Sequence, residues 1–317
     1  MNVRRQRGVA LIVAVLVVAL AAVLIAAMLD RGEAALARTR NLQRAEQGWE
    51  LMRGMEAWAG VVLQRDQDDR PGVDSREDIW AQELPPIDLP GVRILGRLRE
   101  LNGCFNLNDL HRDGADDTLA IARFGRLLRA LKLDPLISDQ VLDWIDADSM
   151  PRAHGVEDSG LLVARPATRA ANQPFAHVSE LRLLPAVTPK VYAVLEPEVC
   201  ALPSGSGTNL NFVSPAFWMS LSEAITPSMA ERLWRDGRAS YDTLEAVAQE
   251  LTQLGLAQVP LVGLGVASNW FVLDATILAD DIPFSYSSLL QRQAGGARVH
   301  ARARGCLVAD PTGRVRC

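Results

Sequence analysis

An unbroken run of apolar residues occupies positions 9–29 near the start of the chain. A helix rises about 1.5 Å per residue, so this run reaches roughly 30 Å, which is the thickness of a membrane's hydrocarbon core. Arg4, Arg5 and Arg7 precede the run, and positively charged flanks stay on the cytoplasmic side. The pattern predicts a transmembrane helix over residues 9–29, with the chain after Asp30 on the far side of the membrane.

A second pattern follows the membrane segment. Apolar residues from Leu36 to Trp58 recur at helical spacing with charged residues between them, and the sequence RDQDDRPG then breaks the pattern. We expect one long helix that spans the membrane in its first half, is amphipathic in its second half and ends near Arg65.

The rest of the chain alternates between strand-like and helix-like segments. Residues 92–110 have the pattern of two short strands or a hairpin, with a turn near residues 101–103. Helical patterns follow, and the pattern returns to strands after Gly263. The words FNLN (Phe105–Asn108) and TNLN (Thr208–Asn211) resemble each other, and we interpret them as equivalent strand ends at which helical domains begin. The pattern indicates an α+β protein with a large helical insertion.

Composition and motifs narrow the functional classes. The chain has 317 residues, which is enough for more than one domain. Its net charge of −5 argues against a nucleic-acid-binding protein, because such domains usually carry a basic face. The sequence has no H-E-x-x-H, no G-x-S-x-G and no P-loop, and its four histidines are scattered. We therefore expect no enzymatic activity.

Four cysteines predict disulfide bonds, because the count is even and the chain carries an export signal. The turn sequence at residues 310–313 would pair Cys306 with Cys317 across a hairpin. Cys104 and Cys200 then remain, and each precedes an Asn-Leu-Asn word, so a bond between them would join the two ends of the inserted helical domain. Three pairings are possible in principle, and we favour this one.

The sequence DWIDADSMPRAHGVEDSG, which begins at Asp143, concentrates carboxylates in one loop. Asp146 and Asp148 lie on one side of the loop, and Glu157 and Asp158 lie on the other. Calcium takes about six to eight oxygen ligands, and flexible loops often supply them. These four residues are therefore candidate calcium ligands, with a spacing that is not that of an EF-hand. The alternative is a solvated loop whose aspartates cap helices.

The junction between Gly8 and Val9 resembles the class III leader of type IV pilins and pseudopilins, because a short basic leader ends in Gly and an apolar helix starts at once. In that family a prepilin peptidase cuts after the Gly and methylates the new N-terminus, which implies cleavage and methylation at Gly8 and Val9. Most pilins have Glu at the fifth mature position, where this chain has Val13. A carboxylate among apolar helices is unfavourable unless it is paired. In a filament this Glu is thought to pair with the N-terminal amine of the subunit above it. A subunit at the tip has no neighbour above it and so no amine for that pairing, which is why Val13 fits the tip subunit.

Further motifs make the chain similar to the minor pseudopilin K (GspK) family of the type II secretion system. They are RGVALIVAVLVVAL, GCFNLNDL, VLDWIDADSMPR, GVEDSG, HVSELRLL, LEPEVCALP and NLNFVSPAFW. The resemblance implies a pilin-like core, made of a long N-terminal helix and an antiparallel sheet, with a large inserted all-α domain of two SAM-like parts and bound calcium. It implies a tip subunit that primes and caps the pseudopilus with the I and J subunits, above H and the major pseudopilin. It also implies an inner-membrane anchor, a periplasmic C-terminal part, and the exported protein or the outer-membrane channel as further partners.

The resemblance also divides the chain into segments. They are a prepilin leader (1–8), a transmembrane helix (9–29), the spine helix with the first strands of the core (30–108), a first SAM-like domain (109–205), a second SAM-like region (206–262) and the C-terminal strands of the core (263–317).

Other functional classes remain as alternatives. One is a membrane-anchored periplasmic hydrolase, which would need an organised Ser/His/Asp cluster. Another is a minor pilin of a type IV pilus, which differs from a pseudopilin in its partner subunits. The last is a plain membrane-anchored periplasmic binding protein, which would keep its leader.

Overall fold

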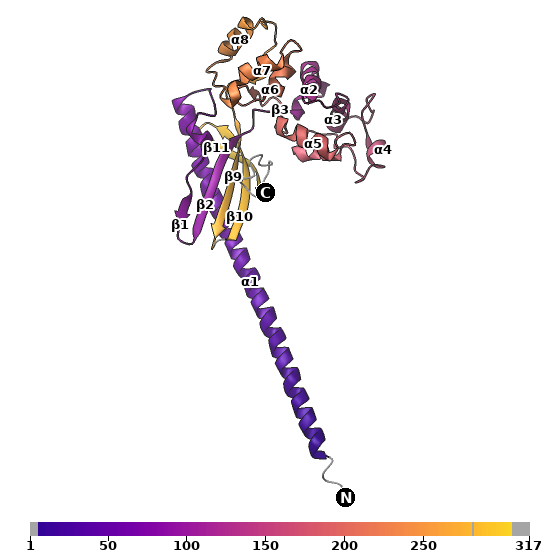
Figure 1. The fold of residues 1–317 in the computed structure, drawn as a ribbon, viewed down its shortest axis with the longest axis vertical. Helices are drawn as coiled ribbons and strands as arrows, with labels where there is room; N and C mark the ends of the chain where they lie inside the picture. The colour runs from indigo at the N-terminus through magenta and orange to yellow at the C-terminus, as the bar shows by residue number, and fades with distance from the viewer. Residues whose placement is uncertain (1–5, 281, 306–317) are drawn as a thin grey trace. The chain divides into compact units, whose positions relative to one another are not determined.

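The computed structural model describes residues 6–280 and 282–305 of the chain. Residues up to Arg53 form one unit, and residues from Gly54 onward form a second. A single helix, α1 (Gln6–Asp69), runs through the first unit and into the second (Figure 1). It ends one turn beyond Arg65, because Asp66 and the residues up to Asp69 continue the helical hydrogen bonding before the turn that contains Gly72.

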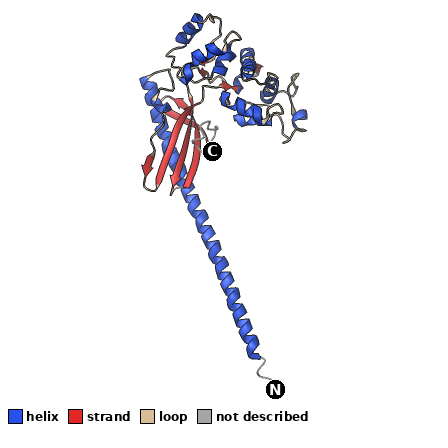
Figure 2. Cartoon of the chain, viewed as in Figure 1, coloured by secondary structure: helices blue, strands red, loops and turns tan. Residues whose placement is uncertain are grey.

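A five-stranded antiparallel sheet forms part of the second unit (Figure 2). Its strand order is β1-β2-β9-β10-β11, and β2 and β9 pair directly along their length although residues 101–269 lie between them in the chain. The helical part of the protein is therefore an insertion between two neighbouring strands, as the sequence predicted. The strands are β1 (Ile87–Leu89), β2 (Val92–Glu100), β9 (Trp270–Ala279), β10 (Ile282–Gln293) and β11 (Gly296–Arg304).

The last four turns of α1 pack on one face of this sheet. Met55, Ala59 and Leu63 are buried there, and a Cβ on Gly96 of β2 would lie 2.7 Å from the Cε atom of Met55. Helix and sheet can approach this closely because position 96 has no side chain. The fold class is the predicted one: a long N-terminal helix, an antiparallel sheet and an inserted helical part.

The insertion consists of two helical modules, which Figure 1 shows as two groups of helices. The first helical module covers residues 105–200 and contains α2 (Thr118–Ala130), α3 (Ile137–Ile145), α4 (Asp158–Leu161) and α5 (Pro189–Leu195). The second helical module covers residues 208–265 and contains α6 (Pro215–Leu221), α7 (Pro227–Trp234) and α8 (Leu244–Gln253). Short 3₁₀ helices occur at Ile79–Ala81, Leu107–Asp109, Val178–Leu183, Glu196–Glu198 and Arg235–Gly237.

Each module is closed by a two-residue parallel strand pair. In the first module β3 (Phe105–Asn106) pairs with β6 (Val199–Cys200), and in the second β7 (Thr208–Asn209) pairs with β8 (Leu264–Gly265). A small hairpin, β4 (His111–Arg112) and β5 (Ala115–Asp116), follows the first opening strand. Of the two alternatives predicted for residues 92–110, the two strands are present as β2 and β3. The hairpin is wrong, because β3 pairs with a distant segment instead of with β2.

The two Asn-Leu-Asn words make matching hydrogen bonds, which supports their interpretation as equivalent. The Asn108 side chain accepts from Phe175 N at 2.7 Å and donates to Phe175 O at 3.0 Å. The Asn211 side chain accepts from Tyr241 N at 2.7 Å and donates to Tyr241 O at 3.0 Å. In both words the first Asn accepts a hydrogen bond from the backbone N–H of the second. Each word therefore fixes a distant aromatic residue's backbone inside its own module.

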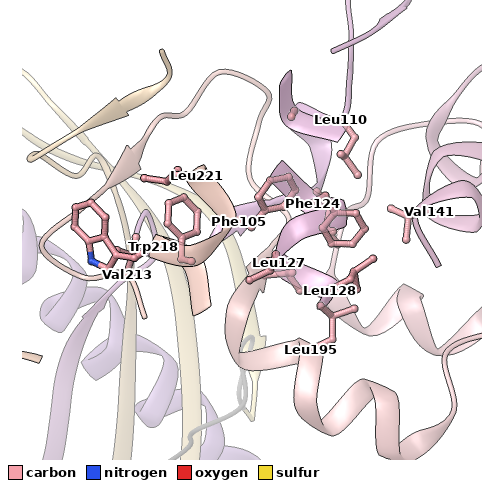
Figure 3. Close-up of a cluster of buried hydrophobic side chains, with 14 of the residues drawn as sticks. Phe105, Leu110, Phe124, Leu127, Leu128, Val141, Leu195, Val213, Trp218 and Leu221 are labelled. Carbon is pink, nitrogen blue, oxygen red and sulfur yellow. The ribbon is translucent and has the colours of Figure 1, made fainter. Parts of the chain in front are cut away.

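The two modules share one hydrophobic core (Figure 3). It contains Phe105, Phe124 and Leu127 from the first module and Trp218 and Leu221 from the second. Burial of large apolar side chains on both sides of the boundary favours a single packed body. The insertion is thus two similar modules joined through their interior.

Candidate functional site

The acidic loop lies between two helices of the first module. Helix α3 ends at Ile145, where Asp146 is the C-cap residue, and α4 begins directly after Glu157. The loop over residues 146–157 therefore starts with the carboxylate of Asp146 and ends with that of Glu157. Both side chains face inward, with Asp146 3% exposed and Glu157 4% exposed.

The structure brings three of the four predicted ligands together. Asp146, Asp148 and Glu157 each place a carboxylate oxygen within 4.8 Å of the others. Asp146 Oδ1 and Glu157 Oε1 are buried and have no hydrogen-bond partner. A buried carboxylate oxygen without a partner is unfavourable, and hard cations such as calcium bind carboxylate oxygens. The donor set therefore fits a divalent cation.

The charges around Glu157 agree with this assignment. Burial, together with repulsion from Asp143, Asp146, Asp148 and Asp158, raises the pKa of Glu157 to about 6. A group of carboxylates that repel one another is stabilised when a cation enters between them.

The fourth predicted ligand, Asp158, lies outside the group. Its Oδ1 atom accepts from Ala170 N at 2.9 Å, and its Oδ2 atom lies 3.9 Å from Arg169 Nε. It is the first residue of α4, so its side chain orders the chain that follows the helix instead of facing the loop. Sequence adjacency to Glu157 made it look like a ligand, but neighbouring residues at a helix start point in different directions.

Two further residues belong to this region, and neither was predicted as a ligand. Asp143 is fully buried, and Arg152 Nη1 donates to Asp143 Oδ1 at 2.8 Å and also contacts Asp146 Oδ2. The sequence signal that could have found this ion pair is the three-residue spacing of Asp143 and Asp146 at the end of a helix, followed by an arginine in the next loop.

The disulfide bond joins Cys104 and Cys200, with their Cα atoms 5.8 Å apart. Cys200 lies in β6 and pairs in register with Asn106, so the bond lies directly beside the strand pair that closes the first module. This is the pairing that we favoured for these two residues. Cys306 and Cys317 lie outside the described residues, and their pairing stays a prediction.

The N-terminal residues of the predicted processing site lie in α1. Gly8 is helical, Val9 is 62% exposed and Val13 is 52% exposed. Within the described residues, α1 is the one helix long and apolar enough to cross a membrane, with a mean hydropathy of 3.3 in its most apolar window. Cleavage and methylation at Gly8 and Val9, and the role of Val13, stay predictions.

Comparison with known proteins identifies the family. The family model for type II secretion system protein K matches residues 103–204, which include the acidic loop and the disulfide bond. Type II secretion system protein K of Pseudomonas aeruginosa is 34% identical, over 95% of this chain and 94% of that protein. The Klebsiella pneumoniae protein of the same description is 31% identical, over 91% of this chain and 93% of that protein.

A solved structure agrees with these relatives. The crystal structure of the GspK-GspI-GspJ complex from enterotoxigenic Escherichia coli contains a chain that matches with a TM-score of 0.70 and 27% identity. The match covers 85% of this chain and 99% of that one, so it includes both the sheet and the helical modules. On the similarity of sequence over nearly the whole length and of fold, this chain belongs to the type II secretion system protein K family and is a minor pseudopilin.

Proposed function

We propose that this chain is the tip subunit of a type II secretion pseudopilus and starts the filament together with I and J subunits. The observation that carries the proposal is the insertion of two helical modules between β2 and β9. The modules join the sheet where α1 ends, since Asp74 N donates to Val266 O at 2.8 Å. A pilin subunit that carries such a mass beyond the end of its spine helix leaves no room for another subunit above it.

The other steps of the proposal rest on the N-terminal segment. α1 anchors the chain in the inner membrane, and the sheet and modules lie in the periplasm, because the arginines precede the apolar run. Prepilin peptidase cuts after Gly8 and methylates Val9. Val13 takes the place of a glutamate that, at the tip, would have no amine to pair with. The relative in the GspK-GspI-GspJ complex supports I and J subunits as partners.

Two measurements test this function. The N-terminal peptide from membrane-extracted protein should begin at methylated Val9 only when prepilin peptidase is present, and Gly8→Ala should abolish this processing. The full-length processed chain should then co-purify with I and J subunits. An intact Met1 leader, or processed protein that captures neither subunit, would contradict the proposal.

A matched pair of variants tests the tip assignment itself. Val13→Glu restores the glutamate found in other pilins, and Val17→Glu places the same carboxylate one turn further along the same apolar helix. We expect both variants to assemble less than the wild type in a cell-based secretion assay, because neither carboxylate finds a partner at the tip. Normal secretion by Val13→Glu, with loss only in Val17→Glu, would show that an amine is available and that this chain is not at the tip.

We also propose that Asp146, Asp148 and Glu157 bind calcium in the periplasm. The support is the pair of buried, unpartnered oxygens on Asp146 and Glu157. Calcium there would add positive charge between repelling carboxylates and would order the loop over residues 146–157. When bound, calcium supplies a structural cross-link within the first module and no chemistry.

Calcium titration of the detergent-solubilised full-length chain tests the site. We expect binding at roughly 10⁻⁴ to 10⁻³ M, the range of extracellular modules, and a higher thermal unfolding midpoint with calcium than with a chelator. Asp146→Asn and Glu157→Gln should each weaken binding at least about tenfold, whereas Asp158→Asn should bind like the wild type. Equal losses in all three variants would show that the ligand set is wrong.

A further inference from the structure

Arg152 contacts three carboxylates from three different parts of the first module. Its Nη1 atom lies 2.8 Å from Asp143 Oδ1 on α3 and also contacts Asp146 Oδ2 at the helix end. Its Nη2 atom lies 2.8 Å from Asp116 Oδ2 on β5. The planar guanidinium, with five N–H donors in fixed directions, suits such a junction.

The contacts of Arg152 leave other oxygens of the carboxylate group without a hydrogen-bond partner. Arg152 takes Oδ2 of Asp146, while Oδ1 of the same carboxylate has no hydrogen-bond partner. Glu157 Oε1 is likewise unpartnered and buried. One carboxylate can therefore hold the guanidinium with one oxygen and a cation with the other. The arginine does not compete for the position that the cation would take.

Asp143 holds the loop in place instead of serving as a ligand. Its Oδ2 atom accepts from Arg152 N at 3.1 Å, and a Cβ added to Gly155 would lie 1.8 Å from the same oxygen. The loop thus closes over Asp143 at a position where only glycine fits. Asp143 is also fully buried, so Arg152 supplies the positive charge that it needs.

The same guanidinium links the loop to the β4–β5 hairpin. Asp116 accepts from Arg152 with Oδ2, and its Oδ1 atom lies 2.8 Å from His111 Nδ1. The next residue, Asp117, caps the start of α2 by accepting from the backbone N–H groups of Leu119 and Ala120. A change in the loop is therefore connected, through Arg152, to the start of the central helix of the module.

We propose that Arg152 is a positioning residue for the cation site: its three-way contact holds the loop over residues 146–157 in its cation-binding shape before the cation arrives. This inference rests on the proposed calcium site. Groups that orient metal ligands without touching the metal typically change metal affinity by about 10- to 100-fold when they are removed.

The test compares Arg152→Lys with Arg169→Lys in the detergent-solubilised full-length chain. Lysine keeps the charge but cannot span three carboxylates. Arg169 is a matched control, because it lies beside the same loop, 78% exposed, at 3.9 Å from Asp158. We expect Arg152→Lys to weaken calcium binding about tenfold or more in calorimetric titration and Arg169→Lys to leave it unchanged. Equal affinity in Arg152→Lys and the wild type would overturn the inference while leaving the calcium proposal intact.

A second measurement needs no cation. In the presence of a chelator, amide hydrogen exchange over residues 146–157 should be faster in Arg152→Lys than in the wild type or Arg169→Lys, because the loop has lost its fixed shape. Unchanged exchange in Arg152→Lys would show that the guanidinium does not hold the loop. A wild-type chain that takes up no calcium would contradict the calcium proposal and the cation role of Arg152, and the exchange result would still decide whether Arg152 fixes the loop.

Asp116→Asn covers the case in which Arg152→Lys fails to fold. It removes one charge at the partly exposed end of the contact and leaves Asp143 and Asp146 with their arginine. We expect a smaller loss of calcium affinity than in Arg152→Lys, together with faster exchange in the loop. Wild-type affinity and exchange in Asp116→Asn would overturn the three-way contact.

Discussion

The two helical modules begin and end in the same way but differ in what they carry. Both open with Asn-Leu-Asn and close with a two-residue parallel strand pair. The first module has a disulfide bond beside its closing pair and a carboxylate-rich loop between α3 and α4. Residues 208–265 contain no cysteine, and no carboxylate group of this kind is found among the described residues of the second module.

The comparison distinguishes the residues that build both modules from the features that the first module has in addition. Asparagines that bind a distant backbone follow the opening strand of both modules. Of the two modules as far as the structure describes them, only the first has a disulfide bond beside its closing strand pair and a group of three carboxylates in a loop. The two modules therefore share a frame and a core, and the disulfide bond and the carboxylate loop distinguish the first from the second.

The largest effect is expected when the disulfide bond of the first module is removed. Cys104→Ser with Cys200→Ser removes a link across a sequence separation of 96 residues, which should lower the free energy of unfolding by about 4 kcal/mol. Urea unfolding measures the loss, and hydrogen exchange should show it mainly in residues 105–200. The control is Cys306→Ser with Cys317→Ser, which leaves this bond in place. Equal loss of protection in both modules would argue that the shared core, and not the bond, governs the first module.

A somewhat smaller effect should appear equally in both modules. Asn108→Ala and Asn211→Ala each leave an aromatic residue's backbone N–H and C=O without their partner in a buried setting. Each variant should lose about 3 kcal/mol of stability in urea unfolding. A loss in one variant only would show that the two words are not equivalent.

The smallest effect concerns a buried carboxylate between the chain segments that lead into the first module and out of the second. Glu100, at the end of β2, accepts hydrogen bonds from Gly103 N before the first module and from Ser268 Oγ after the second. Burial raises the pKa of Glu100 to about 7, above the value of an unfolded chain. The stability that it contributes is therefore complete below about pH 4.5 and is lost as the pH rises through about 7.

We accordingly expect the free energy of unfolding to fall by roughly 2 to 3 kcal/mol from this group as the pH rises from about 5 to 8. Glu100→Gln should lessen this dependence, and the exposed control Glu223→Gln should not. Some dependence should remain in Glu100→Gln, because burial and the neighbouring Asp78 and Asp74 also raise the pKa of Asp66 to about 7. A stability that rises with pH over this range in the wild type, and not in Glu100→Gln, would reverse the assignment.

The sequence predicted the elements whose pattern is local. The apolar run and the amphipathic spacing gave α1, and the strands after Gly263 appear as β9, β10 and β11. The hairpin over residues 92–110 failed because β3 has two residues and finds its partner at Val199. No periodicity reports a pairing between such short and distant segments.

The candidate site was predicted in outline and not in detail. The density of carboxylates located the loop, and Asp146, Asp148 and Glu157 do meet. Asp158 was included with Glu157 as a carboxylate on the second side of the loop, and the search for carboxylate ligands did not consider Arg152. Which oxygen is paired and which is free depends on side-chain directions, and sequence spacing does not contain them.

The insertion between β2 and β9 also governs the order in which the protein can fold. β2 leaves the ribosome long before β9, so the central pairing of the sheet must wait for the whole of residues 101–269. A flexible connection of that length slows the encounter of the two strands. Because each module draws its own ends together, and Leu101 N finally donates to Trp270 O at 2.9 Å, folded modules bring the two strands into register. The folded helical modules would in this way act as the template on which the sheet forms.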